Sequence, residues 1–430
     1  MTHLALHTDH YELTMVQAAL RSGAATRHCV FEVFTRSLLD GRRYGVCAGL
    51  GRLLAMLPDF RFDEESLGFL ASTGVVDTAT CEWLSTYRFS GSIDAYAEGE
   101  VYFPGSPVLV VEGAFAECVL LETLVLSVLN HDSAVATAAA RMVCAAGARP
   151  CIEMGSRRTH EEAAVASARA AYLAGFSATS NLAAGLQWGV PTTGTAAHAF
   201  VLVHDDEAGA FAAQVDALGI GTTLLVDTYD VEAGIRAAVA AAGPALGAVR
   251  LDSGDLLSEA RRARELLDGL GATAARIVVT SDLDEGSIAR LAGAPVDAYG
   301  VGTSVVTGGG VPTAGFVYKL VAIESGSGWQ PVQKRSAGKH SVGGRKSPVR
   351  RYAGGTAAAE QIYVGGPAPP RAGERPLLVR VVDDGAVLPG PTLTASREHC
   401  RRSVAELPQE AMKLSAGDPA IETQWERVPT

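Results

Sequence analysis

The middle of the chain contains a series of short apolar runs, each of which ends in polar residues. They read CIEMGSRRTHE (151–161), FSATSN (176–181), PTTGTAAHAF (191–200), TTLLVDTYD (222–230), GAVRLDSGD (247–255), RIVVTSDLDE (276–285) and VDAYGVGTS (296–304). The ends of neighbouring runs lie roughly 20–30 residues apart, which is the length of one strand, one helix and their loops. Parallel strands are buried on both faces and therefore apolar, and their carboxyl ends carry the active sites of α/β folds. The series predicts an enzyme with an α/β barrel-like domain.

The chain on either side of this series has a different pattern. Residues 91–115 contain short alternating runs broken by Gly and Pro, which is typical of an antiparallel β module, and an Ala-rich helical stretch follows. Beyond residue 320 the sequence is rich in Gly, Lys and Arg and then gives short β-like runs. We predict an N-terminal α+β domain (1–125), an irregular α/β barrel domain that need not have eight regular strands (126–320), and a C-terminal segment that packs back on the N-terminal domain (321–430).

The charge of the chain limits its partners. The 430 residues include 36 Lys and Arg against 47 Asp and Glu, which gives a net charge of −11. Proteins that bind nucleic acid usually present a basic face, so this balance argues against a nucleic-acid partner. It leaves phosphate binding open, because a phosphate needs only a local group of backbone amides and a few basic side chains.

The sequence predicts a cytoplasmic protein without a membrane partner. No apolar run reaches the roughly 18–20 uninterrupted residues that span a bilayer, and the best stretch, 114–129, carries Glu117 and Glu122. The N-terminus lacks the basic and apolar regions of a secretory signal. The seven cysteines are scattered, without zinc spacing or a CxxC pair, which favours reduced thiols.

The run VRLDSGD brings Arg250, and then Asp252 and Asp255 on either side of Ser253 and Gly254, to the end of a predicted strand. An arginine can bind a carboxylate through two parallel hydrogen bonds, and aspartates can hold a sugar diol or a Mg²⁺-bound phosphate. Glycine lets the backbone approach a ligand closely. Taken alone, the run is equally compatible with an ordinary strand-end turn that contains a salt bridge.

Three further strand ends carry groups that suit a phosphate. VTSDLDE supplies Ser281 and Asp282, and YGVGTS supplies Gly302 and Thr303 with backbone N–H groups ahead of a predicted helix. GSRRTHE supplies paired arginines, of which Arg157 is the first. Each segment alone is also compatible with a Gly-rich turn or a solvated helix start. The two consecutive strand ends together favour a phosphorylated sugar as the ligand.

Two ring side chains are candidates for roles in catalysis or binding. His198 follows Gly-Thr in GTAAHAF and sits among small residues, which suits a nucleophilic or phosphate-contacting imidazole. A lone histidine is, however, more often structural. Tyr11, in TDHYELTM, is flanked by polar groups, and it would stack on a flat ring as a lid or pack in the core.

Taken together, these segments give the chain a resemblance to nicotinate phosphoribosyltransferase, a type II phosphoribosyltransferase. The resemblance covers most of residues 8–346 and runs in order through TDHYELTM, FEVFTR, RRYGVCAGL, EMGSRRTHE, SNLAAG, GVPTTGTAAHAF, LLVDTYD, VRLDSGD, VTSDLDE, YGVGTS and KRSAGKHSVGGRK. It implies that nicotinate and 5-phosphoribosyl 1-pyrophosphate form nicotinate mononucleotide and pyrophosphate, coupled to ATP hydrolysis. It further implies Mg²⁺, the salvage route to NAD, and a homodimer with shared active sites.

The resemblance also implies roles for individual residues of the barrel domain. His198 would be phosphorylated transiently by ATP, and Arg250 would help to bind nicotinate. Asp252 would contact the ribose or its Mg²⁺ during catalysis, and Arg157 would face phosphate groups. The 5′-phosphate would be held by the backbone around Ser281, Gly302 and Thr303. The substrate site would also include Ser253, Gly254 and Asp282.

Two residues of the N-terminal part would reach the active site of the neighbouring subunit. Tyr11 would stack on the pyridine ring, and Arg36 would cross the interface. The chain departs from relatives at Met154, where an aromatic residue often precedes the strand-end Gly, although the methionine sulfur can still pack against a ring. The SLLDGRR segment after Arg36 also lacks a Pro that is often found there. Neither change affects the phosphate or carboxylate groups.

Other functions would use a similar fold. A nicotinamide phosphoribosyltransferase would need an acceptor for the carboxamide N–H, and the sequence places no extra acid next to Arg250. A quinolinate enzyme would release CO₂ and lacks the phosphorylated histidine. A non-catalytic sensor would tolerate loss of His198, Arg250 or Asp252, which are all present. A metal-dependent barrel hydrolase would need His-x-His or carboxylate-bridging spacing, which the sequence does not have. These comparisons favour the nicotinate enzyme.

Overall fold

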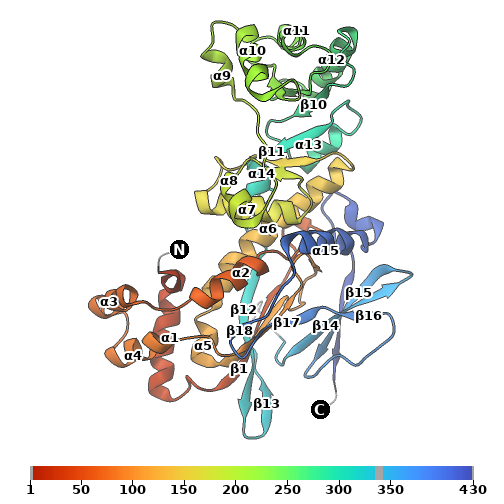
Figure 1. Ribbon diagram of the computed structural model, residues 1–430. Coiled ribbons are helices and arrows are strands. Elements are labelled where there is room, and N and C mark those ends of the chain that lie inside the picture. The colour runs from red at the N-terminus through yellow and green to blue at the C-terminus, as the bar shows by residue number, and fades with distance from the viewer. Residues whose placement is uncertain (1–2, 335–341, 429–430) are drawn as a thin grey trace. The chain divides into compact units, whose positions relative to one another are not determined.

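The structure of the protein is a computed structural model that describes residues 3–334 and 342–428. The chain forms two compact units (Figure 1). The barrel unit comprises residues 138–310. The flanking unit comprises residues 1–137 together with 311–430. Each unit has its own sheets and helices.

The limits of the units differ from the domain boundaries predicted from the sequence. The boundary predicted at 125/126 falls inside helix α6 (Glu122–Ala146), and the boundary at 320/321 falls inside strand β12 (Phe316–Ser325). In both places a single helix or strand continues across the predicted position. The chain instead passes between the units after residues 137 and 310.

The barrel unit, all of whose residues are described, is built on one parallel sheet. From edge to edge the sheet contains β7 (Ala178–Thr179), β6 (Cys151–Glu153), β11 (Ala298–Val301), β10 (Arg276–Val279), β9 (Ala248–Leu251) and β8 (Thr223–Leu225). The first strand, β6, pairs with the last, β11, as in a closed barrel. The sheet remains open between β7 and β8. The predicted α/β fold with an irregular barrel-like domain is therefore confirmed.

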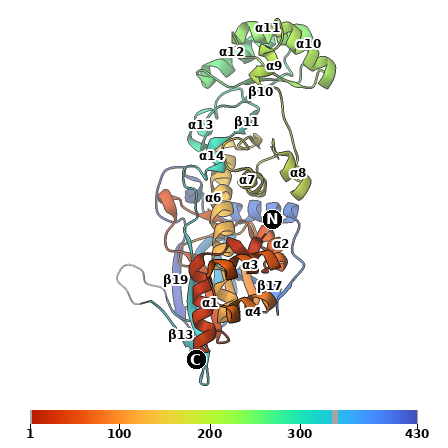
Figure 2. The same cartoon turned by 90° about the vertical axis from the view of Figure 1, so that its left-hand side faces the viewer.

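Helices follow the strands of the barrel unit and cover them. They are α7 (Glu161–Leu173), α8 (Leu182–Trp188), α9 (His198–Leu202), α10 (Glu207–Leu218), α11 (Val231–Ala242), α12 (Leu256–Gly269), α13 (Glu285–Arg290) and α14 (Thr303–Val306). Helices α9 to α12 lie side by side (Figures 1 and 2). The strands are buried beneath their connections; Val249, Ile277 and Tyr299 are fully buried.

Several helices of the barrel unit begin at a side chain that accepts a hydrogen bond from the helix backbone. Asn181, Asp206, Asp230 and Asp284 accept from backbone N–H groups in the first turns of α8, α10, α11 and α13, respectively. These caps satisfy N–H groups that have no partner inside the helix. Some of the polar residues between apolar runs are thus needed to start helices, whatever their role in a site.

The flanking unit contains three sheets within its described residues. The largest has the order β13 (Gly328–Pro331), β12, β1 (His28–Thr35), β5 (Leu109–Ala114), β3 (Ser92–Tyr96), β17 (Leu378–Asp383) and β18 (Ala386–Val387). The second has the order β16 (Glu374–Pro376), β14 (Lys346–Ala353), β15 (Thr356–Val364) and β19 (Glu422–Arg427), and the third pairs β2 (Gly45–Val46) with β4 (Val101–Tyr102). Because β12 and β17 pair with N-terminal strands, the C-terminal segment packs on the N-terminal domain as predicted.

The helices of the flanking unit come mostly from its N-terminal part. They are α1 (His10–Ser22), α2 (Leu50–Met56), α3 (Glu64–Thr73), α4 (Thr78–Thr86), α5 (Phe115–Val119) and α15 (Leu393–Ala405), with short 3₁₀ helices at Leu4–His7, Leu39–Gly41, Leu57–Asp59 and Gln409–Met412. Helices α1, α3 and α4 lie close together in Figure 2. Their apolar faces pack into a core that includes Leu13, Leu70 and Leu84.

One helical stretch passes a simple test for a membrane span. Phe115–Ala146 is long and apolar enough to cross a membrane by length and composition. However, 67% of its most apolar 18-residue segment is buried inside the protein. A core helix has the same properties, and the burial of this stretch favours that role.

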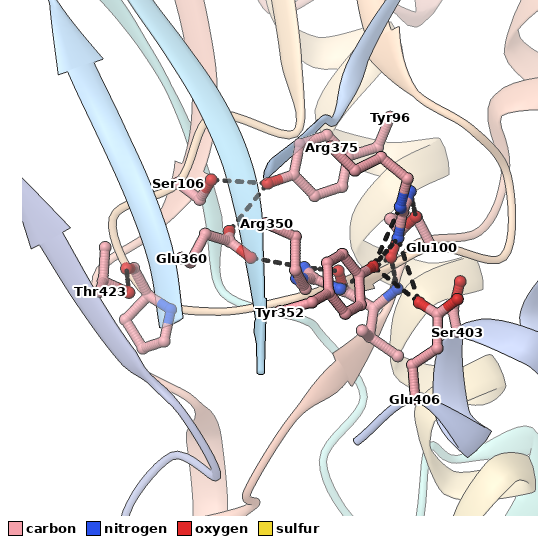
Figure 3. Close-up of polar contacts among 12 residues, drawn as sticks. Tyr96, Glu100, Ser106, Arg350, Tyr352, Glu360, Arg375, Ser403, Glu406 and Thr423 are labelled. Carbon is pink, nitrogen blue, oxygen red and sulfur yellow. Dashed lines mark hydrogen bonds and ion pairs between the residues drawn. The ribbon is translucent and has the colours of Figure 1, made fainter. Parts of the chain in front are cut away.

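A buried arginine, a partly exposed arginine and two buried glutamates join the C-terminal segment to the N-terminal part of the flanking unit (Figure 3). Arg350 of β14 is fully buried and donates to Oε1 of Glu100 at 2.8 Å and to Oε2 of Glu360 at 2.5 Å. Arg375 of β16 donates to Oε2 of Glu100 at 2.7 Å, and Nε2 of His399 lies 3.0 Å from the same oxygen. Each buried carboxylate is thereby paired, which offsets the cost of removing its charge from water.

The network also changes the acidity of Glu100. Burial alone would raise the pKa of Glu100, but the hydrogen bond from His399 and the charges of Arg350 and Arg375 hold this pKa well below its usual range. The ionised carboxylate therefore stabilises the folded state at pH values above the ordinary pKa of a glutamate. This stabilisation is lost as the pH falls through the lowered pKa.

Replacing Arg350 by Met is expected to lower the free energy of unfolding by about 3–5 kcal/mol, because two buried carboxylates lose their partner. Arg351→Met is the matched control, since Arg351 is the next residue of β14 but is exposed and donates to Gln424. Urea denaturation followed by tryptophan fluorescence measures both variants. Equal stability of the two variants would contradict this account of the network.

Candidate active site

The carboxyl ends of four neighbouring strands surround one pocket of the barrel unit. Its volume is about 190 Å³. The lining residues are Met154, Arg157, Arg158, Arg250, Asp252, Thr280, Ser281, Asp282, Gly300, Gly302 and Thr303. They follow or end strands β6, β9, β10 and β11, which are adjacent in the sheet. The pocket thus lies where parallel α/β folds place their active sites.

Most of the barrel residues that were predicted from the sequence meet in this pocket. They are Arg157, Arg250, Asp252, Ser281, Asp282, Gly302 and Thr303. Three further lining residues, Arg158, Thr280 and Gly300, were not singled out, and Met154 was noted only as a departure from relatives. The doublet in GSRRTHE was a signal for Arg158, whereas nothing in the sequence distinguishes Thr280 from an ordinary strand residue.

Arg250 of β9 is held in place by hydrogen bonds on several sides. Its Nε donates to Oγ1 of Thr280 at 2.9 Å, and its Nη1 donates to Oγ1 of Thr195 at 3.1 Å and to the carbonyl of Ala196 at 3.3 Å. Its Nη2 lies 3.3 Å from Oδ1 of Asp252. A guanidinium fixed in this way loses little freedom when it binds an anion in a defined orientation.

A buried glutamate shapes the turn that carries the paired arginines. Glu153, the last residue of β6, accepts a hydrogen bond from the backbone N–H of Gly155 and another from Oγ1 of Thr179 at 2.5 Å. Burial raises the pKa of Glu153 above its usual value. The turn continues with a hydrogen bond from Arg158 N to Gly155 O of 2.8 Å. A Cβ on Gly155 would lie 2.2 Å from Cγ1 of Val306, so this turn requires glycine.

The backbone after β10 adopts an unusual conformation in the pocket. Ser281 has φ 119°, a region that L-residues other than glycine seldom occupy. The segment is held by a hydrogen bond of 2.9 Å from Thr280 N to Leu251 O and one of 2.8 Å from Leu283 N to Ser281 O. Strain of this kind persists only where the surrounding structure enforces it, and it is common at binding sites.

His198 lies beside the pocket rather than in its lining. It is the first residue of α9, and its side chain is 40% exposed. Its Nδ1 lies 3.1 Å from Oγ1 of Thr228, and its Nε2 lies 3.8 Å from Oδ2 of Asp252 and 4.0 Å from Oδ1 of Asp227. Asp252 therefore connects His198 to the pocket, because the same carboxylate also approaches Arg250.

Asp227 is a site residue that was not singled out from the sequence. Its side chain is only 2% exposed. Oδ2 of Asp227 accepts hydrogen bonds from Asp252 N at 2.8 Å and from Oγ of Ser253 at 2.7 Å. The signal was present in TTLLVDTYD, in which an acidic residue directly follows an apolar run. Asp227 thus fixes the start of the Asp252–Gly254 loop while it faces His198.

Ser253 and Gly254 lie outside the first pocket. They line a second one with Tyr229, which precedes α11, and with Glu232, Glu259 and other residues of α11 and α12. Ser253 remains connected to the site through its hydrogen bond to Asp227. Their contact with substrate stays a prediction.

Tyr11 and Arg36 belong to the flanking unit, and both are exposed. Burial and the charges of Glu122, Glu12 and Asp9 raise the pKa of Tyr11 to about 12, so its phenol is neutral at physiological pH. Stacking of Tyr11 on a substrate ring stays a prediction. In the segment KRSAGKHSVGGRK, residues 335–341 lie outside the described residues.

The pocket offers carboxylates rather than a complete cage for a metal. Among the described residues, no group of three or more His, Cys, Asp and Glu side chains is arranged to hold an ion. Mg²⁺ that binds together with a phosphorylated substrate needs only one or two protein carboxylates. Asp252 and Asp282, which both line the pocket, fit this requirement.

An open parallel barrel with arginines, aspartates and glycines around one pocket defines an α/β-barrel protein with a site suited to anions. Residues 6–130 match the family model described as nicotinate phosphoribosyltransferase (NAPRTase) N-terminal domain. Nicotinate phosphoribosyltransferase pncB1 of Mycobacterium tuberculosis is 58% identical, with coverage of 97% of this chain and 94% of that protein. Nicotinate phosphoribosyltransferase of Homo sapiens is 31% identical, with coverage of 95% and 92%. The chain therefore belongs to the nicotinate phosphoribosyltransferase family, and the resemblance drawn from its motifs is confirmed.

The fold of the chain also matches two solved structures. The crystal structure of human nicotinic acid phosphoribosyltransferase has a TM-score of 0.85 and 28% sequence identity, and the match covers 97% of each chain. A nicotinate-nucleotide pyrophosphorylase from Pyrococcus furiosus gives a TM-score of 0.77 at 25% identity, with coverage of 94% of this chain and 96% of that one. Both matches cover the barrel and flanking units together.

Arg157→Ala and Arg158→Ala are each expected to raise the Kd of the pocket for pyrophosphate by on the order of tenfold, because each removes a charge-assisted contact. Isothermal titration calorimetry with pyrophosphate and Mg²⁺ measures this change. Arg261→Ala is the control, since Arg261 is an exposed arginine of α12 that does not line the pocket. Unchanged affinity in both arginine variants would exclude this turn as the phosphate site.

Proposed function

We propose that the protein transfers the phosphoribosyl group of 5-phosphoribosyl 1-pyrophosphate to the ring nitrogen of nicotinate, which forms nicotinate mononucleotide and releases pyrophosphate. Membership of the family supports this reaction. The observation that carries the proposal is the position of Arg250, a fixed cation in the same pocket as Arg157 and Asp252. Such a pocket suits a ligand set with one carboxylate and several phosphates.

The side chains of the pocket suit displacement at an anomeric carbon. The reaction passes through an oxocarbenium-like state, and the Asp252 carboxylate would stabilise the positive charge that develops on the ribose. Arg157 and Arg158 would bind the leaving pyrophosphate as its negative charge increases. Arg250 would hold the carboxylate of nicotinate and orient the ring. The pyridine nitrogen already has a free lone pair, so the reaction needs no general base.

Asp252 and Asp282 would hold Mg²⁺ together with the diphosphate of the donor. When bound, Mg²⁺ would supply charge neutralisation at the leaving pyrophosphate. The strained backbone at Ser281 and the N–H groups around Gly302 and Thr303 would bind the 5′-phosphate, because the start of a helix presents unpaired N–H groups.

We further propose that ATP hydrolysis is coupled to this transfer through His198. The γ-phosphoryl group of ATP would pass to a ring nitrogen of His198 with ADP as the leaving group, and water would later hydrolyse the phosphohistidine. The exposure of the imidazole and its approach to Asp252 and Asp227 support this role. If Nε2, which faces these carboxylates, carries the proton, the lone pair lies on Nδ1, and the phosphoryl group would replace the contact of Nδ1 with Oγ1 of Thr228.

In the cell, this activity would serve the salvage of nicotinate to NAD in the cytoplasm. We propose that the protein acts as a homodimer with shared active sites, in which Tyr11 of one subunit stacks on the pyridine ring in the other. The exposed position of Tyr11 on α1 supports a contact with another molecule, since 46% of this large ring is accessible.

The reaction is tested by steady-state turnover with nicotinate or nicotinamide, each with 5-phosphoribosyl 1-pyrophosphate and Mg²⁺, in the presence and absence of ATP. The expected result is nicotinate mononucleotide as the product, formed faster with ATP. A preference for nicotinamide would overturn the proposed substrate while it leaves the reaction class intact. No turnover with either base would support a sensor instead of an enzyme.

His198→Ala is expected to abolish stimulation by ATP, so that the ratio of the rates with and without ATP falls to about one. The reason is that the variant has no acceptor for the phosphoryl group. His204→Ala is the control, because His204 lies just beyond α9 and Nδ1 of its ring lies 2.7 Å from the carbonyl of Phe200, within the same segment. Stimulation that persists in His198→Ala would contradict the phosphohistidine.

A further inference from the structure

The hydroxyl of Thr280 lies between two charged side chains of the pocket. Its Oγ1 accepts a hydrogen bond of 2.9 Å from Nε of Arg250 and donates one to Oδ1 of Asp252. A hydroxyl makes both bonds at once, because it carries one hydrogen and two lone pairs. Thr280 is only 3% exposed, so water has little access to compete for these bonds. The hydroxyl therefore bridges the cation and the carboxylate.

The pairing of two strands brings Thr280 to this position. Strands β9 and β10 are adjacent and parallel, and Leu251 at the end of β9 lies beside Val279 at the end of β10. A hydrogen bond of 2.9 Å from Thr280 N to Leu251 O continues the pairing beyond both strands. As a result, the first residue after β10 lies next to the first residue after β9, which is Asp252.

A glycine on the next strand fixes the orientation of the Thr280 side chain. A Cβ on Gly300 of β11 would lie 2.5 Å from Cγ2 of Thr280, so the threonine methyl occupies space that this glycine leaves open. Branching at Cβ also restricts the rotamers of threonine. With its methyl against Gly300, Thr280 directs its hydroxyl to Arg250 and Asp252.

Arg250 and Asp252 are close but do not form a direct hydrogen bond. Nη2 of Arg250 lies 3.3 Å from Oδ1 of Asp252, whereas charge-assisted bonds between such groups are about 2.7–2.9 Å long. On the other side of the guanidinium, Nη1 is held by Thr195 and the carbonyl of Ala196. Among the described residues, neither Nη2 of Arg250 nor Oδ2 of Asp252 makes a hydrogen bond. These two atoms are therefore available to a ligand.

An unrestrained guanidinium and carboxylate form a pair with two parallel hydrogen bonds, and Nε and Nη2 form one such edge of the guanidinium. The Thr280 hydroxyl already occupies Nε, so Asp252 cannot take both positions. We propose that Thr280 is a positioning residue that prevents Arg250 and Asp252 from pairing, which keeps Nη2 free for the carboxylate of nicotinate and Oδ2 for the ribose. The inference rests on the proposed function, which gives Arg250 and Asp252 these ligands.

Two substitutions separate the hydroxyl of Thr280 from its shape. Thr280→Val replaces the hydroxyl by a methyl group, whereas Thr280→Ser keeps the hydroxyl and loses the methyl that contacts Gly300. Thr137→Val is the matched control, because Thr137 is 2% exposed and its hydroxyl bonds to Val46 N at 2.9 Å and Ser133 O at 2.6 Å in the flanking unit. Both valine variants lose a buried hydroxyl, but one of them alone loses the bridge between the charged groups.

Steady-state kinetics are expected to show that Thr280→Val raises the KM for nicotinate and lowers kcat by about tenfold each, because the pairing withdraws both Arg250 and Asp252 from substrate. Thr280→Ser is expected to stay within about threefold of the wild type in both constants, and Thr137→Val to keep the wild-type KM. A merely structural role would reduce the amount of active enzyme, and hence kcat, without changing KM. The proposal is overturned if KM is unchanged in Thr280→Val, or if Thr280→Ser is impaired as strongly as Thr280→Val.

Crystal structures of the wild type and Thr280→Val without substrate test the inference independently of turnover. In the variant, the distance from Nη2 of Arg250 to Asp252 is expected to shorten from 3.3 Å to about 2.8 Å, with a second hydrogen bond at Nε. Normal wild-type turnover together with unmoved side chains in the variant would refute the role of Thr280 and leave the proposed function intact. No turnover of nicotinate by the wild type would instead refute the proposed function, and the role of Thr280 with it.

Discussion

The pairing of strand β6 with β11 is the constraint on which the site depends. These strands come from opposite ends of the barrel unit, and they join through parallel register from Tyr299–Cys151 to Val301–Glu153. A hydrogen bond of 2.8 Å from Met154 N to Val301 O extends the pairing past the end of β6. This pairing brings the turn that carries Arg157 and Arg158 against the glycine-rich end of β11. Without this pairing, groups about 150 residues apart in the sequence would not share a pocket.

Buried acids around the pocket hold the groups that would act on substrate. Glu153 shapes the arginine turn, and Asp227 fixes the loop that begins at Asp252. Thr280 connects Arg250 with Asp252 through hydrogen bonds to both. These residues are therefore supports for the binding groups. Such supports decide how well a site is organised before substrate arrives, and this organisation is where much of the rate acceleration of an enzyme originates.

The sequence was sufficient to predict the barrel-like fold and most of the pocket, because apolar runs that end in polar residues reveal buried parallel strands. It did not reveal Glu153 as a support, since its partner Thr179 belongs to a different strand, β7. Nor could it show that one oxygen of Asp227 is buried without a hydrogen-bond partner among the described residues, because this depends on side-chain geometry. The predicted domain boundaries differ from the limits of the units for a simpler reason. Helix α6 continues across one of these limits.

The central claim, that the phosphorylated donor binds at the carboxyl ends of β6, β10 and β11, is tested most directly by hydrogen–deuterium exchange. Backbone exchange is compared in the free protein and with 5-phosphoribosyl 1-pyrophosphate and Mg²⁺. The account predicts slower exchange at residues 154–158, 280–283 and 300–304, where the backbone borders the pocket. Protection confined to other regions, such as the second pocket between α11 and α12, would contradict it.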